Sequence, residues 1–156
     1  MKPSDEFVEQ IQLHKGLINK VVFFYANHDQ DRHDLYQEIL YQSWKSYKHF
    51  KGDAKFSSWL YRISLNVAIS FLRKKTKDIG SVEVNNTKTD TSAKELLEEI
   101  LSVLNPVEKS IVLLLVEGYE QAEIAEILGM SKVNIRVKIH RLRKKLNDHG
   151  VEKFIG

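Results

Sequence analysis

The strongest constraint on the fold is a run of helix-boundary signals near the C-terminus. Glu120 to Leu128 has the length and apolar spacing of a short helix, and the following Gly129 is typical of a helix end. Ser131 then fits the N-cap of a longer helix that extends to about Asn147. A short helix, a tight turn and a second helix make up the helix-turn-helix pattern.

The second helix of this pair has one apolar side and one basic side. Its apolar residues recur at spacings of four, three and four, which places them on one face: Ile135, Ile139, Leu142 and Leu146. Ile124, Ile127 and Leu128 supply the inward face of the first helix. A basic outward face suits the major groove of DNA. We predict that duplex DNA is contacted by Ser131, Lys132, Val133, Asn134, Arg136, Val137, Lys138, His140, Arg141 and Lys144.

Helical periodicity also dominates the rest of the chain, and no strand pattern competes with it. Apolar spacing in the N-terminal part predicts three helices, at about 7–22, 35–47 and 57–73. The segment 76–91 has few large apolar residues and is typical of a flexible linker. We therefore expect an all-α protein with two small domains, residues 1–75 and 92–156, joined by this linker.

Capping residues mark the helix starts of the C-terminal domain. Ser92 and Glu95 have the Ser-x-x-Glu spacing of a capping box, just before an apolar run. Asn105, Pro106 and Glu108 combine a capping residue, a first-turn proline and an acid in the first turn. The domain is therefore expected to start near Ser92.

Charge is segregated along the chain. Residues 45–77 contain nine Lys or Arg and one acid, whereas residues 95–128 contain eight Glu and one Lys. Residues 129–148 contain seven Lys or Arg and one Asp. Two basic segments separated by an acidic one suggest two nucleic-acid surfaces. Solvated helix faces are the alternative explanation of such charge runs.

Aromatic residues gather in the first basic segment. Seven of the 15 aromatic residues lie between Tyr41 and Tyr61, interleaved with lysines. Bases of single-stranded DNA stack on aromatic rings while cations follow the phosphates, although most of these rings are expected in the core. The third predicted helix is apolar on two sides and leaves a narrow polar stripe. We predict single-strand contacts by Lys48, Lys51, Lys55, Phe56, Trp59, Arg62, Asn66 and Arg73.

Acidic residues, among them Asp31, Asp34 and Glu38, precede the aromatic segment. Asp34 and Glu38 are four residues apart and share a helix face, beside His33. A metal site is one interpretation, but the spacing lacks a convincing ligand set. A protein-docking face is the interpretation we prefer, and no metal is expected.

Several functional classes are disfavoured by what the sequence lacks. The chain has no cysteine, and we find no glycine-rich phosphate loop and no convincing acid–base pair. No run of about 18 apolar residues is present, and the N-terminus has no signal-peptide stretch. We expect a cytoplasmic protein that is not an enzyme, has no cofactor and does not insert into a membrane.

Ordered motifs along the chain resemble those of RNA polymerase sigma factors. Asp34–Ile39 is similar to their polymerase-binding motif. Phe50–Ile63, followed by Asn66 and Leu72-Arg73, resembles their promoter-melting and −10-reading segment. Their −35-reading domain is similar to three further segments: Leu104–Lys109, Glu123–Ser131 and His140–Leu146. The size and the linker resemble the smallest branch, the extracytoplasmic-function (ECF) sigma factors.

The resemblance implies functions for the sites and implies partners. Docking on the β′ clamp helices of core polymerase would involve Asp34, Leu35, Gln37 and Glu38. The aromatic segment would capture −10 bases and the C-terminal helix would read the −35 element as duplex. The β flap of polymerase, promoter DNA and an anti-sigma factor are the further partners implied. A stand-alone helix-turn-helix regulator remains the alternative, but it leaves the aromatic segment and the Asp34 motif unexplained.

Overall fold

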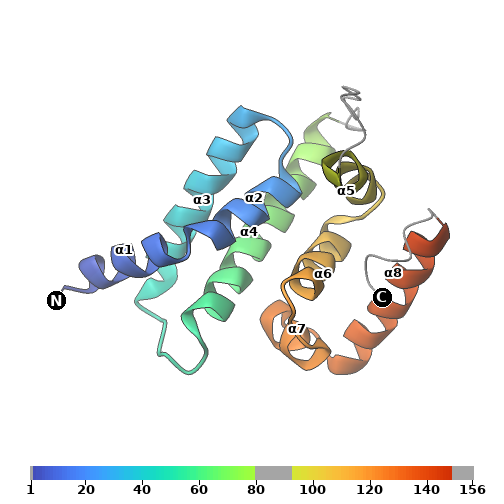
Figure 1. The fold of residues 1–156 in the computed structure, drawn as a ribbon. Helices are drawn as coiled ribbons and strands as arrows, with labels where there is room; N and C mark the ends of the chain where they lie inside the picture. Colours follow the sequence, from blue (N-terminus) through green and yellow to red (C-terminus); the bar gives the residue numbers. More distant parts are fainter. Residues whose placement is uncertain (1, 80–92, 149–156) are drawn as a thin grey trace. The chain divides into compact units, whose positions relative to one another are not determined.

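The computed structural model of the protein describes residues 2–79 and 93–148. The chain divides into two compact units, Met1–Lys74 and Lys75–Gly156. Within the described residues every regular element is an α-helix (Figure 1). The predicted all-α class is therefore confirmed.

Unit 1 is built around two long helices. It contains α1 (Pro3–Leu13), α2 (Lys15–Tyr25), α3 (Asp29–Tyr47) and most of α4 (Phe56–Ile79). Figure 1 shows α3 and α4 running in opposite directions, joined at one end by the loop 48–55. The core is made of fully buried aliphatic side chains from three helices: Ile18, Val21, Leu35, Ile39, Leu60 and Leu65.

The prediction of a single first helix was wrong, because the chain breaks at His14. The backbone of His14 leaves the helical region, at φ −116° and ψ 21°, and α2 starts at the next residue. The ring Nδ1 of His14 lies 2.8 Å from the carbonyl oxygen of Gln10, so the side chain bonds to the last turn of α1. Gly16 follows, and glycine is a poor helix former.

Helix α4 is longer than predicted but has the two apolar sides that we expected. Leu60 and Leu65, which are five residues and therefore about 140° apart around this helix, are both fully buried, so α4 packs on two faces. The helix continues to Ile79, and no glycine or proline interrupts the sequence before Gly80. The first four residues of the predicted linker, 76–79, are therefore helical. The linker residues from 80 onward lie outside the described residues.

Unit 2 contains the predicted helix-turn-helix. Its helices are α5 (Ala93–Ser102), α6 (Pro106–Val116), α7 (Gln121–Leu128) and α8 (Lys132–Asp148). Gly129 adopts the left-handed conformation at φ 66°, and Met130 N–H donates to the carbonyl of Ala125 at 2.9 Å. The Ser131 hydroxyl accepts a hydrogen bond from Asn134 N–H at 3.1 Å, which caps α8. The predicted turn and cap are both confirmed, whereas the predicted cap Ser92 lies outside the described residues.

One network ties α6 to α8. Asn105, predicted as a capping residue, forms a capping box with Glu108, with both hydrogen bonds at 2.8 Å. The Glu108 carboxylate also accepts a hydrogen bond from Lys145 Nζ at 2.9 Å, as an ion pair across 37 residues. The capping residue Glu108 of α6 is therefore also bonded to the C-terminal half of α8.

Candidate nucleic-acid interfaces

Helix α8 has a sharp division between its buried and its exposed sides. Its apolar stripe is almost completely removed from solvent, because four residues are each at most 1% exposed: Ile135, Ile139, Leu142 and Leu146. The opposite side carries Val133 and Val137, which are 64% and 40% exposed. The sequence-predicted orientation of this helix is confirmed.

Polar and basic residues surround the two valines. Lys138 is partly buried, while the other predicted contacts on α8 are exposed: Lys132, Asn134, Arg136, His140, Arg141 and Lys144. Ser131, also exposed, uses its hydroxyl in the cap. Apart from the partly buried Lys138, the whole predicted set is exposed along α8 and at its N-cap.

The predicted base-stacking rings of unit 1 belong to an aromatic cluster. Trp59 lies 5.3 Å from Phe56, 5.1 Å from Phe50 and 6.1 Å from Tyr47, measured between ring centroids. Phe7 of α1 contacts Tyr47 at 5.2 Å. Phe56 and Trp59 still expose part of their surface. This aromatic cluster holds the loop 48–55 and the start of α4 against α1.

The cations of the same region are open to solvent. Lys48, Lys51 and Lys55 are exposed around the loop, where Gly52 takes a positive φ of 80°. Farther along α4, the predicted polar stripe is exposed at every predicted position: Arg62, Asn66 and Arg73. The partly exposed Trp59 is followed three residues later by Arg62, so rings and cations form one continuous surface along the start of α4.

The acidic face of α3 is exposed and organised by glutamines. Asp34 accepts a hydrogen bond from Gln30 at 2.9 Å, and Glu38 accepts one from Gln42 at 2.9 Å. Gln37 is also exposed. Leu35, which was predicted to take part in docking, is fully buried at 0% exposed and so does not present its side chain on this face. Leu35 supports this face from the core.

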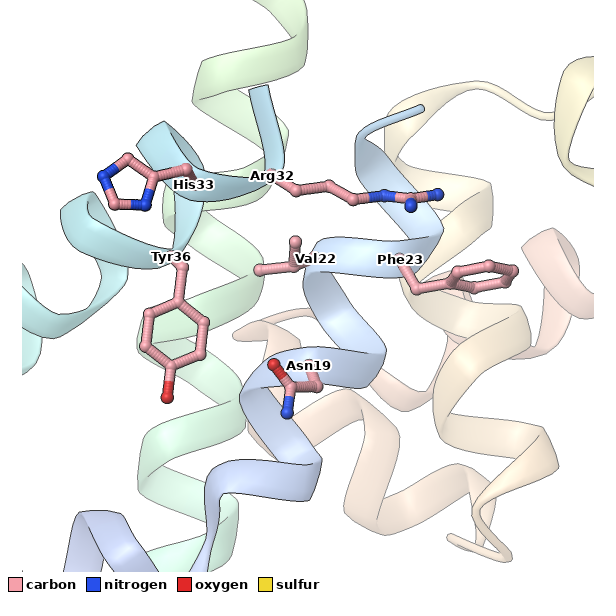
Figure 2. Close-up of a pocket in the computed structure, with 6 residues that line it drawn as sticks. All are labelled: Asn19, Val22, Phe23, Arg32, His33 and Tyr36. Carbon is pink, nitrogen blue, oxygen red and sulfur yellow. The ribbon is translucent and has the colours of Figure 1, made fainter. Parts of the chain in front are cut away.

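A shallow hollow lies between α2 and the start of α3. Its volume is about 370 Å³, and its lining combines apolar, aromatic and cationic side chains: Asn19, Val22, Phe23, Arg32, His33 and Tyr36. Figure 2 shows Arg32 extending toward Phe23, while His33 and Tyr36 lie on the other side. Arg32 Nε donates to the carbonyl of Ala26 at 3.0 Å, and its guanidinium carbon lies 5.4 Å from the centre of the Phe23 ring. Arg32 thereby connects the start of α3 to α2.

Two exposed aromatics on α3 were missing from the predicted sites. Tyr41 is 57% and Trp44 is 48% exposed. Tyr41 follows Asp34 by seven residues, which is about two helical turns, so both occupy one face of α3. That spacing was present in the sequence, but we had expected most rings of this segment to be buried.

Two further features bear on the kind of site present. Within residues 2–79 and 93–148, no group of three or more His, Asp or Glu side chains is arranged to hold a metal ion. None of the helices in the described part of the chain combines the length and apolar character needed to cross a membrane.

Comparison with known families accounts for both units. Residues 10–78 match the family model of sigma-70 region 2, and residues 94–146 match that of sigma-70 region 4. The chain belongs to the ECF sigma factors of the sigma-70 family. It is an alternative sigma factor, and the stand-alone helix-turn-helix regulator is not favoured, because region 2 accounts for the N-terminal half.

Relatives of this sigma factor cover most of its length. It is 26% identical to the ECF sigma factor SigW of Bacillus subtilis, over 93% of this chain and 91% of SigW. It is 27% identical to the ECF sigma-E factor of Escherichia coli, over 78% of this chain and 74% of that protein.

Two solved structures share the fold of this sigma factor. Bartonella quintana RpoE, solved in complex with the anti-sigma factor NepR, superimposes with a TM-score of 0.72 at 19% identity, over 92% of this chain and 95% of that chain. CnrH, solved with the cytosolic domain of CnrY, gives a TM-score of 0.66 at 21% identity, over 93% and 87%.

Proposed function

We propose that this sigma factor divides promoter recognition between its two units, with unit 1 docking on polymerase and holding opened DNA while unit 2 reads duplex DNA. The observation that carries this proposal is that the two basic surfaces lie in separate units. Each unit is compact, so each surface is positioned by its own core. Separate surfaces suit two promoter elements that differ in being single-stranded or double-stranded.

The docking face for core polymerase is assigned to α3. Asp34, Gln37 and Glu38 are exposed and would meet the β′ clamp helices. Tyr41 and Trp44 continue this surface with exposed aromatic area, a feature common at the energetic centres of interfaces. Exposed acids next to apolar rings favour an electropositive partner surface with apolar side chains.

The −10 element is assigned to the aromatic loop and α4. Phe56 and Trp59 would stack on unpaired bases, while the loop lysines follow the phosphates of that strand. Arg62, Asn66 and Arg73 extend the path along α4. Contacts made only with the opened strand favour the open promoter over the closed one, so binding energy alone would assist melting. This function assigns no catalytic residue and no cofactor to the chain.

The −35 element is assigned to the exposed side of α8. A rigid helix with an exposed basic face can enter the major groove, and its N-terminal residues would then contact base edges. The boundaries 1–75, 76–91 and 92–156 are retained as the proposed division into functional domains and linker.

Further partners and the compartment follow from this assignment. Bartonella quintana RpoE was solved with the anti-sigma factor NepR, and we propose that an anti-sigma factor also binds this chain. The β flap of polymerase is a second proposed contact, for unit 2. Because polymerase and promoter DNA are its partners, the protein is proposed to act in the cytoplasm.

The test is the affinity of the purified chain for core polymerase. Asp34→Lys and Glu38→Lys should each weaken binding at least about tenfold, because charge reversal replaces attraction with repulsion. Glu9→Lys, at an exposed acid of α1 outside this face, is the matched control and should bind normally. Unchanged affinity in both α3 variants would contradict the assigned docking face.

A further inference from the structure

Two of the outward-facing residues of the duplex-reading helix, Val133 and Val137, are apolar. At about 100° per residue, the buried stripe of α8 is centred nearly opposite the midpoint between Val133 and Val137. The two valines lie about 40° apart around the helix axis and are 64% and 40% exposed. The N-terminal half of this face would therefore present valine methyl groups to the floor of any groove that it entered.

Cationic side chains stand on both sides of this apolar ridge, which we define as Val133 and Val137. The cations Arg136 and Arg141 lie toward opposite sides of the ridge, and the polar side chains His140 and Asn134 lie beside them, respectively. Cations placed beside an apolar centre can reach the phosphates on the two walls of the groove, while the ridge faces the base edges. In this arrangement the cations would position the helix on the DNA, and the valines would distinguish the bases.

We propose that the apolar ridge makes unit 2 select thymine, through the C5 methyl group that thymine presents in the major groove. This inference rests on the proposed function of α8 and adds the identity of a base to it. Adenine, guanine and cytosine present only hydrogen-bonding groups there, which a valine would desolvate without replacing their bonds. Selection thus comes both from methyl contact with thymine and from the penalty on the other bases.

The spacing of the ridge sets the spacing of its targets. Four residues of α-helix rise about 6 Å. Neighbouring base pairs are separated by about 3.4 Å. Where α8 follows the groove, the two valines meet positions about two base pairs apart.

The experiment begins with a selection. Holoenzyme, formed from core polymerase and the full chain, selects from promoter duplexes that are randomised across the −35 element. Each selected thymine is then replaced by deoxyuridine, which removes only the methyl group and keeps the base pairing. Affinity is measured by competition for the native chain, for Val133→Ala and for Val137→Ala. Lys144→Ala is the matched control, because this exposed cation lies on the same side of α8.

We expect deoxyuridine to weaken binding about fourfold at one position or at two, the change that corresponds to losing one buried methyl group. This loss should disappear in one of the valine variants and persist in Lys144→Ala. Circular dichroism should show all three variants folded, because their side chains point away from the core.

Two results would overturn the proposal. One is a selected −35 element that contains no thymine. The other is a methyl effect that is absent, or that is equal in the native chain and in both valine variants. If the proposed function itself were wrong, the result would differ. Holoenzyme and core polymerase alone would then select the same sequences from the randomised −35 element.

Discussion

The two surfaces assigned to DNA differ in how their apolar side chains are held. In unit 1, Phe56 and Trp59 are packed among other rings and expose only part of their area. In unit 2, Val133 and Val137 stand out from a helix that is fixed by its other side. Substitutions in the aromatic cluster should therefore change stability and function together, whereas substitutions on the apolar ridge should change function alone.

The largest effect that tests this contrast is expected from Trp59→Ala. Loss of the ring contacts should destabilise unit 1 by about 2 kcal/mol, less than for a fully buried tryptophan. Transcription should fall more on duplex promoters than on templates already mismatched at the −10 element, because stacking on an unpaired base contributes about 1–3 kcal/mol. Chemical denaturation and run-off transcription measure the two effects.

Phe7→Leu is the matched control for Trp59→Ala. Phe7 contacts the same aromatic cluster from α1 but is buried. Phe7→Leu should lower the stability of unit 1 without changing the ratio of transcription on duplex promoters to transcription on mismatched templates. If Trp59→Ala lowered transcription equally on both templates, the Trp59 side chain would act through packing alone.

In unit 2, Glu108 is the residue that supports the recognition helix from a distance. Glu108→Ala removes one capping hydrogen bond and the ion pair with Lys145, and should destabilise unit 2 by about 1 kcal/mol. Glu108→Gln can keep the capping hydrogen bond but not the ion pair. Its stability should therefore lie between that of the native chain and that of Glu108→Ala. If neither variant changes thermal unfolding, the network does not hold α8 in place.

A smaller change separates positioning from reading on α8. Arg141→Ala and Lys144→Ala should weaken every −35 sequence alike and lower the slope of log K against log salt by about 0.9 each. Val137→Lys should instead change which sequences are preferred. A changed preference profile in the two cationic variants would show that they read bases rather than hold phosphates.

The smallest expected effect concerns Lys109 of α6. Burial lowers the pKa of its amino group below the usual value, so the folded state binds that proton less tightly than the unfolded chain. Its contribution to stability therefore improves as pH rises through the lowered folded pKa, up to the unfolded value of about 10.4. The difference in unfolding free energy between the native chain and Lys109→Met should therefore change with pH, in favour of the native chain as pH rises toward about 10. A pH-independent difference would contradict this.

Local signals predicted unit 2 more completely than unit 1. Gly129, Ser131 and the capping box at Asn105 act through neighbouring residues, so sequence was sufficient to place them. The ion pair between Glu108 and Lys145 joins residues 37 positions apart, and local pattern carries no information about such a pair.

In unit 1, the missed features depend on tertiary packing. The break at His14 involves a ring that bonds to Gln10 and also contacts Phe56, at 5.1 Å between centroids. Leu35 matched the docking motif by position, yet its side chain faces the core. Motif position indicates which turn of a helix meets a partner, and helical phase decides which side chains reach it.

The central claim is that this chain gives core polymerase promoter specificity through two separate surfaces. The most direct measurement is transcription by purified core polymerase on a library of duplex promoters, with and without the chain, followed by mapping of RNA 5′ ends. We predict new start sites that depend on the chain and lie downstream of two sequence elements. The preferred sequence of the upstream element should change when Val137→Lys replaces the native chain. Start sites identical to those of core polymerase alone would contradict the account.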